Sequence, residues 1–108
     1  YERLGDVRGK AVTQGNIAGI HFARGELDAA LHIFEHQVLP VYERLGSALD
    51  VMRCRWWIAH ILLVRAHPQD RPRAEALLRQ ALAAARAMQL PDAVEIADVL
   101  RKHGFDPA

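Results

Sequence analysis

Residue types that carry out chemistry are sparse in this chain of 108 residues. It contains one Ser, one Thr, one Cys and two Lys, namely Ser47, Thr13, Cys54, Lys10 and Lys102. An enzyme needs a nucleophile, a paired acid and base, or a bound cofactor, and this set offers few combinations of them. The composition therefore predicts a protein that binds rather than one that catalyses, without a cofactor.

Two pairs of side chains have spacings that bear on metal binding or catalysis. His32 and His36 are four residues apart, which places them on one helical face, as two zinc ligands would be. Only Asp28 lies near as a third ligand, so solvated histidines are the better interpretation and we predict no metal site. Cys54 and His60 are six residues apart, or about 240° around a helix, too far apart for a catalytic dyad. We predict that Cys54 is a small core residue.

Charge is unevenly distributed along the chain although the formal net charge is only +1. Between Arg53 and Arg86 there are seven arginines against Asp70 and Glu75, a local excess of +5. Such an excess favours an acidic partner. Arg53, Arg55 and Arg65 would bind its carboxylates, unless they form solvated ion pairs instead. Nucleic-acid binding is a weaker alternative, because the net charge is near zero and lysine is almost absent.

Hydropathy indicates a globular domain outside the membrane. Hydrophobic residues make up 51% of the chain and charged residues 25%. No apolar run approaches the roughly 20 residues that span a bilayer. A single cysteine excludes an internal disulfide, which fits a reducing compartment, and we expect a cytoplasmic protein.

An internal repeat organises the sequence. The run Tyr1-Glu2-Arg3-Leu4-Gly5 recurs as Tyr42-Glu43-Arg44-Leu45-Gly46, so the repeat period is about 41 residues. A looser third copy begins at Leu90 and matches the run from Leu45 at a slightly longer spacing, with the additional length in the loop-like run 67–72. We expect one domain with a first repeat over 6–45, a second over 47–89 and a terminal helix, as a fragment of a longer protein.

The period of the apolar residues between these markers is helical, and no segment alternates as a strand would. Asp6, Ser47 and Asp92 are suitable N-caps, and Gly25 and Gly46 suit left-handed turns. Because the links are short, neighbouring helices must run antiparallel. Pro40 removes a backbone hydrogen bond inside the second helix, so a kink or break is expected near Leu39. The sequence predicts an all-α fold with helices over 6–23, 26–45, 47–66, 73–89 and 92–103.

These helical pairs resemble the tetratricopeptide repeat, whose pattern is W-x2-L-G-x2-Y followed by A-x3-F and later P. The first copy reads Gln14-x2-Ile17-Ala18-x2-His21 and Ala30-x3-Phe34, and the second reads Arg55-x2-Ile58-Ala59-x2-Leu62 and Ala74-x3-Leu78. The leading Trp is missing from both copies, and His21 and Leu62 replace Tyr. The long repeat period is similar to that of the kinesin-light-chain type, which also occurs in bacterial signalling regulators.

The resemblance implies a short right-handed superhelix of stacked hairpins. In this family the first helix of each repeat lines a concave surface that binds a peptide or a partner protein. That surface would carry Val12 and Leu63 here. The resemblance predicts a partner-binding site made of Gly15, Asn16, Gly19, Phe22, Arg53, Trp56, Trp57 and His60.

Two questions stay open at this level. Gly15 and Gly19 weaken a helix, by about 0.8–1 kcal/mol each, so either Trp56 or Trp57 packs over them or they form the floor of a groove. Trp56 and Trp57 point about 100° apart, so at least one should be accessible. The second question is the role of the segment: an architectural or self-associating part of a larger regulator, using apolar ends of the repeat array, is the alternative to partner capture.

Overall fold

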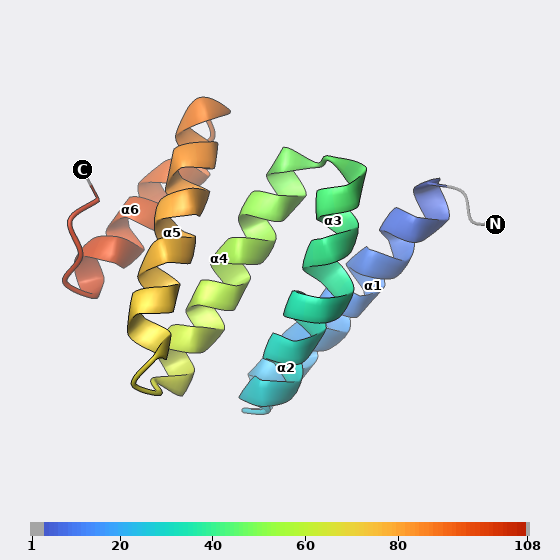
Figure 1. Ribbon diagram of the computed structural model, residues 1–108, viewed down its shortest axis with the longest axis horizontal. Helices are drawn as coiled ribbons and strands as arrows, with labels where there is room; N and C mark the ends of the chain where they lie inside the picture. The colour runs from blue at the N-terminus through green and yellow to red at the C-terminus, as the bar shows by residue number, and fades with distance from the viewer. Residues whose placement is uncertain (1–3, 108) are drawn as a thin grey trace.

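The chain is helical throughout the part that the structure describes. The computed structural model describes residues 4–107 (Figure 1), and within this range there is no strand. The all-α prediction is therefore confirmed, whereas residues 1–3 of the repeated Tyr1–Gly5 run lie outside the described residues. The elements are α1 (Leu4–Ala23), α2 (Leu27–Ile33), the π-helix η1 (Phe34–Val38), α3 (Leu39–Leu45), α4 (Ala48–Arg65), α5 (Asp70–Ala87) and α6 (Asp92–Lys102).

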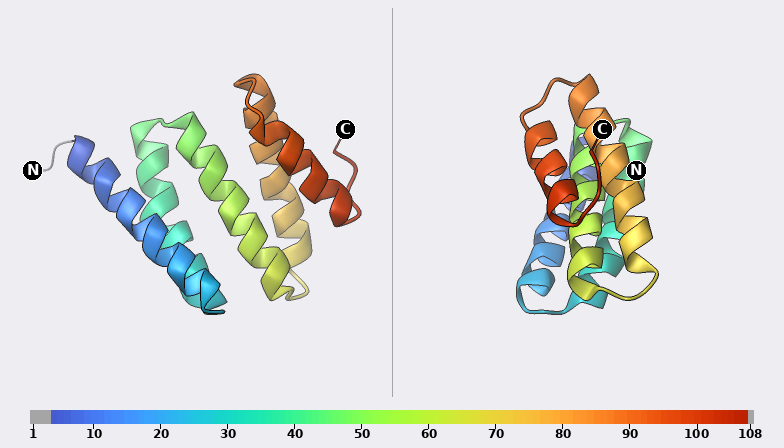
Figure 2. Two further views of the ribbon diagram at one scale, coloured as in Figure 1. Left: turned by 180° about the vertical axis from the view of Figure 1, so that it is seen from behind. Right: turned by 90° about the vertical axis from the view of Figure 1, so that its left-hand side faces the viewer.

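The helices form two layers (Figure 2). α1, α4 and α6 lie in one layer, and the rod α2–η1–α3 and α5 lie in the other. α1 packs on α2–η1–α3, α4 packs on α5, and α6 closes against α5. The two hairpins meet because α2–η1–α3 also packs against α4. We call the side formed by α1, α4 and α6 the cleft face.

The order helix, turn, helix recurs with an offset close to the predicted repeat period. α1 ends at Ala23 and α4 at Arg65, while α3 ends at Leu45 and α5 at Ala87. In each pair, the two helix ends are one position further apart in the sequence than Tyr1 is from Tyr42. The turns use left-handed backbone at Gly25 (φ 79°) and Gly46 (φ 68°), as expected.

The capping of helix N-termini differs from the predictions in three places. α1 begins at Leu4, so Asp6 lies in its first turn and is not the N-cap. α6 begins at Asp92 with Pro91 as its N-cap, since the Asp92 carboxylate binds Arg53 instead of capping the helix. Ser47 is the N-cap of α4 as predicted, but its hydroxyl donates to the Asp50 carboxylate rather than accepting a backbone N–H.

The largest boundary error concerns the run 67–72, predicted as a loop with a helix from 73. α5 begins at Asp70, and Pro72 lies in its first turn, where the missing N–H has no partner to lose. The buried Asp70 carboxylate accepts from the backbone N–H of His67 (3.0 Å) and from both Nε and Nη2 of Arg65 (2.8 and 2.7 Å). These bonds start the helix three residues earlier than the proline suggested.

The predicted break near Leu39 is a local change of winding. η1 ends at Val38, and the N–H of Leu39 donates to the carbonyl of Phe34, five residues back. This wider turn precedes Pro40, which has no N–H to donate to the preceding turn. The Cys54 thiol also reaches the Phe34 carbonyl, with Sγ 3.8 Å from the oxygen. At this π-turn the Cys54 side chain of α4 therefore contacts the backbone of the second layer.

Candidate binding clefts

Two clefts flank α4 on the cleft face. The first, about 490 Å³, lies between α1 and α4 above η1 and α3, and the second, about 460 Å³, lies between α4 and α6. Arg53 and Trp57 line both, so the clefts meet along α4. The first is also lined by Val12, Gly15, Asn16, Gly19, Ile20, Ala23, Phe34, Val38, Tyr42, Asp50 and Cys54, and the second by Trp56, His60, Asp92 and Val99.

The wall contributed by α1 is low because of its glycines. A Cβ on Gly19 would meet no atom within 4 Å, and one on Gly15 would meet only Cε1 of the Phe34 ring, at 3.9 Å. Neither tryptophan covers these positions, so the interpretation that Trp56 or Trp57 packs over the glycines is wrong. Asn16, between them, is exposed and lines the same cleft. Backbone and one amide side chain are thus open to a ligand.

Trp57 is held by aromatic neighbours while part of its indole stays accessible. Its ring stacks on Phe34 at 5.4 Å between centroids and meets Phe22 edge-on at 5.6 Å. Such pairs fix ring orientation. Trp57 nevertheless keeps 40% of its surface exposed, which confirms that one tryptophan is accessible. A rigid, partly exposed indole is suited to anchor a partner.

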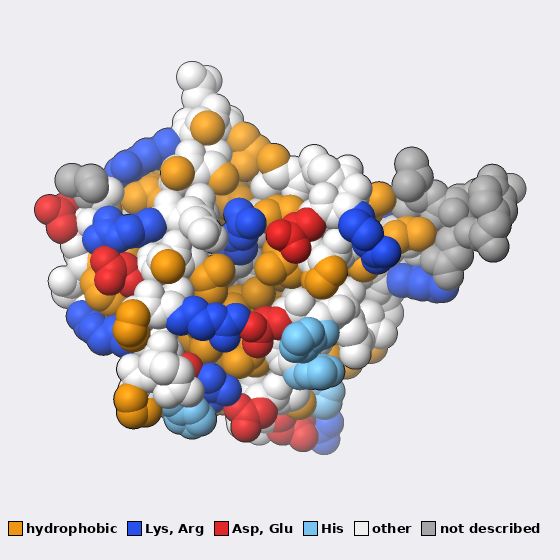
Figure 3. All heavy atoms as spheres, in the orientation of Figure 1, with side chains coloured by type: hydrophobic (Ala, Val, Ile, Leu, Met, Phe, Trp, Pro, Cys, Tyr) orange, Lys and Arg blue, Asp and Glu red, His pale blue; other side chains and the backbone are white. Residues whose placement is uncertain are grey.

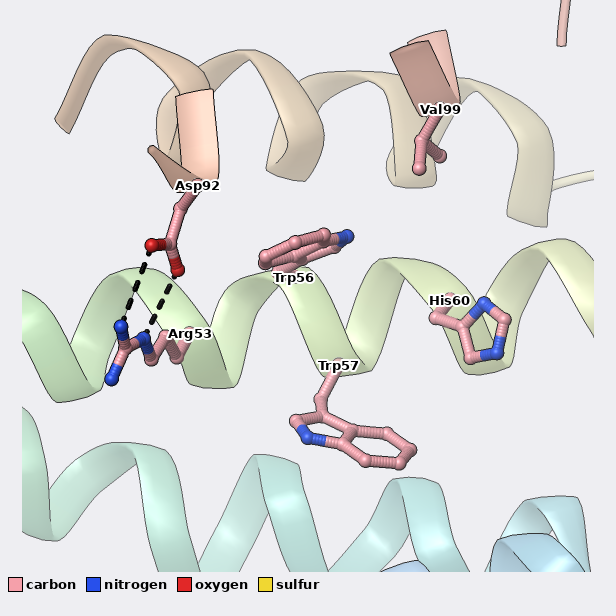
Figure 4. A pocket seen from close by; sticks show the side chains of 6 residues that line it. All are labelled: Arg53, Trp56, Trp57, His60, Asp92 and Val99. Atoms are coloured by element: carbon pink, nitrogen blue, oxygen red, sulfur yellow. Dashed lines mark hydrogen bonds and ion pairs between the residues drawn. The ribbon is translucent and has the colours of Figure 1, made fainter. Parts of the chain in front are cut away.

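Trp56 lies on the other side of α4 (Figure 4). It is half-buried and lines the second cleft together with Val99 of α6, whereas Trp57 points toward the first hairpin. The predicted divergence of the two adjacent indoles is confirmed. The first cleft is consequently lined by Trp57, and the second by both indoles.

His60 completes the aromatic group next to Trp57. Its ring lies 5.0 Å from that of Phe22 and 6.2 Å from that of Trp57. Partial burial against these rings lowers the pKa of His60, and His103 lowers it further. His60 is therefore neutral at pH 7 and offers both a donor and an acceptor nitrogen.

Ion pairs connect the three helices of the cleft face. Nη2 of Arg8 on α1 donates to Asp50 of α4 at 2.8 Å. Arg53 of α4 donates to Asp92 of α6 through Nε at 3.1 Å and Nη2 at 3.4 Å. The hydrogen bond from Arg53 lowers the pKa of Asp92, so the carboxylate is ionised at pH 7. One pair thus connects α1 to α4, and the other connects α4 to α6.

Acidic residues from other parts of the chain form ion pairs with the basic segment predicted from the sequence, so its charge is largely neutralised. Four carboxylates from outside the segment 53–86 pair with its arginines, as Arg53–Asp92, Arg55–Glu43, Arg65–Asp28 and Arg73–Glu35. On the face seen in Figure 3, basic and acidic side chains alternate. Arg65 lies away from both clefts, bound to Asp70 and Asp28, so grouping it with Arg53 and Arg55 as a carboxylate site is wrong.

The remaining candidates for chemistry are Cys54 and the histidine pair His32 and His36. Cys54 is buried, and desolvation, with Glu43 nearby, raises the pKa of its thiol to about 12, as fits the predicted core residue. The rings of His32 and His36 lie 4.7 Å apart. Within residues 4–107 no three His, Cys, Asp or Glu side chains gather as a metal site would require.

All eight residues of the predicted binding site gather around α4. Seven line the clefts, and Phe22 packs against Trp57 and His60. Sequence reasoning missed the acids Asp50 and Asp92 and the mainly apolar lining residues Ile20, Ala23, Phe34, Val38, Tyr42, Cys54 and Val99. A usable signal existed for the two acids: Arg8 and Asp50 are 42 positions apart, and Arg53 and Asp92 are 39 apart, so opposite charges recur about one repeat period away.

Comparison with protein-family models, with curated proteins and with solved structures finds no match for this chain. In the described range, none of the helices combines the length and apolar character needed to cross a bilayer.

Proposed function

We propose that this chain is a protein-interaction module of the tetratricopeptide type, with its hairpins in a short superhelix, that captures a peptide or partner protein along the cleft face. The observation that carries the proposal is the meeting of two clefts at Arg53 and Trp57. A ligand across α4 would contact the glycine backbone of α1 on one side and α6 on the other. Trp57 is its anchor and Asn16 its hydrogen-bonding partner.

The partner is apolar and extended rather than strongly acidic. Ion pairing removes most of the local basic excess, and the linings of both clefts are mainly apolar. The same pairing argues against nucleic acid, which needs a row of arginines available to phosphates. Apolar binding would persist at high salt, whereas phosphate binding would collapse.

Selection of binding peptides from a random library against the chain tests the proposal. Trp57→Ala and Asn16→Ala should each weaken the selected peptides at least tenfold, measured by titration calorimetry at two salt concentrations. Val94→Ala, at an exposed position of α6 that lines neither cleft, is the matched control and should leave binding unchanged. Binding that is insensitive to both cleft variants would refute the cleft face as the site.

A further inference from the structure

One side of α1 repeats a surface that is buried elsewhere in the same molecule. When Tyr1 is aligned with Tyr42, the residues Thr13, Ile17, Ile20 and Arg24 of α1 correspond to Cys54, Ile58, Ile61 and Arg65 of α4. Both isoleucines and the arginine are identical in the two helices, and the remaining pair is small in both. We call the α1 set the outer face of α1.

The two copies of this surface differ completely in exposure. Ile58 and Ile61 are 1% and 0% exposed, whereas Ile17 and Ile20 are 38% and 58% exposed. The Arg65 side chain is 17% exposed and that of Arg24 is 70% exposed. α1 stands at the end of the row of helices in Figure 2, so no further element of the described chain lies beyond it.

The structure also shows what covers this surface on α4. The rod α2–η1–α3 packs against α4, and the Cys54 thiol of this surface lies 3.8 Å from the Phe34 carbonyl oxygen of the rod. At the far end Asp28, in the first turn of α2, accepts from Nη1 of Arg65 at 3.0 Å. Within residues 4–107, Arg24 has no such partner across a helix interface, and its ion pair is with Glu26 at 3.9 Å in the turn beside it.

We infer that the outer face of α1 is a second docking surface, which receives an amphipathic helix with an acidic first turn. The helix lays its apolar face over Ile17 and Ile20 and pairs its carboxylate with Arg24, as the Asp28 carboxylate of α2 pairs with Arg65 of α4. This surface adjoins the first cleft, with Ile20 at the common edge, whereas Ile17 and Arg24 line neither cleft. Ile17 and Arg24 therefore separate its use from that of the cleft face.

The probe for this test is a peptide with the sequence of residues 26–46, capped at both ends. It is stapled between positions 32 and 36, which are both exposed, because an isolated helix of this length is marginal in water. Its affinity for the 108-residue chain is measured by fluorescence anisotropy. Ile17→Gln and Ile20→Gln should each weaken binding about tenfold, since each removes a buried aliphatic side chain from the interface. Val94→Gln on α6 is the control and should bind as the parent does.

A charge exchange tests the polar end of the same interface. Arg24→Asp should weaken the peptide about threefold to fivefold, and a peptide carrying Asp28→Arg should recover the loss with that variant alone. Thermal melts should be unchanged by the outer-face variants because these side chains are exposed.

Two results would overturn the inference. Binding that ignores Ile17→Gln and Ile20→Gln would show that the peptide replaces the internal rod on α4. A chain that forms dimers in sedimentation, and loses them in those variants, would assign the face to a second copy.

Discussion

α1 and α4 occupy corresponding places in the two hairpins, but α4 is covered on two sides and α1 on one. α4 contributes six fully enclosed positions, Met52, Cys54, Ile58, Ala59, Ile61 and Leu62, because α5 covers one side and α2–η1–α3 the other. α1 contributes Ala11 and Ala18 to the described core. Much of the stabilisation therefore comes from α4 and its neighbours, and α1 serves as a wall.

The helical sequences reinforce this contrast. α1 contains four glycines, Gly5, Gly9, Gly15 and Gly19, and α4 contains none. Each glycine in a helix interior costs about 0.8–1 kcal/mol relative to alanine. α1 thus combines weak intrinsic helix formation with limited burial, which leaves the α1 side of the first cleft the easier one to deform.

The largest difference in unfolding free energy between variants of the two helices should appear at their equivalent isoleucines. Ile58→Ala should lower the free energy of unfolding by about 3–4 kcal/mol, because it leaves a cavity in an enclosed site. Ile17→Ala, at the equivalent position of α1, should change it by less than about 0.5 kcal/mol. Urea denaturation of both variants measures the contrast. Equal losses would mean that α1 is covered as fully as α4.

Removing the acidic partner of the arginine at the end of α4 or of α1 should also lower the free energy of unfolding by different amounts, but this difference is smaller than that between the isoleucines. Asp70→Ala should destabilise by about 2–3 kcal/mol, since it leaves the Arg65 guanidinium, largely shielded from water, without its main acceptor. Glu26→Ala, at the exposed pair with Arg24, should cost no more than about 0.5 kcal/mol. Urea denaturation again measures both, and a loss of the same size in each would contradict the difference in burial.

The same pair of variants gives a pH dependence with a defined sign. Hydrogen bonding from Arg65 lowers the pKa of Asp70 from 3.8 to about 2. Between these values the unfolded chain binds the proton more readily, so this stabilisation is complete above about pH 5 and is lost as the pH falls through about 2. Stability of Asp70→Ala should fall less steeply over that range than that of the parent or of Glu26→Ala. An identical slope would contradict the assignment.

Local pattern predicted most of the fold and missed what depends on side-chain hydrogen bonds across a turn. The 3.6-residue period and the glycine turns were sufficient for the helices and their order, because both are properties of neighbouring residues. Pro72 was misleading because a proline in a first turn and a proline in a loop look alike in sequence. Only the Arg65–Asp70 bonds, formed across the turn, distinguish them.

The sequence likewise predicted part of the lining of the two clefts and missed the rest. The resemblance to the tetratricopeptide repeat implied that one face of α1 and one of α4 form the site, which placed Asn16 and Trp57 together. Asp92 and Val99 come from α6, and their position depends on how α6 closes against α5. The neutralisation of Arg53 by Asp92 follows from that closure, so a charge count along the chain overestimated the positive field.

The smallest effect concerns the glycines of α1 and separates stability from binding. Gly19→Ala and Gly9→Ala should each stabilise the chain by about 0.8–1 kcal/mol, since a Cβ meets no atom within 4 Å at either site. Gly19 lines the first cleft and Gly9 does not. If ligand backbone approaches α1, Gly19→Ala should weaken peptides selected against the chain while Gly9→Ala leaves their affinity unchanged. Equal affinity for both variants would show that the low wall of α1 is merely open space, and the partner would then contact α4 and α6 alone.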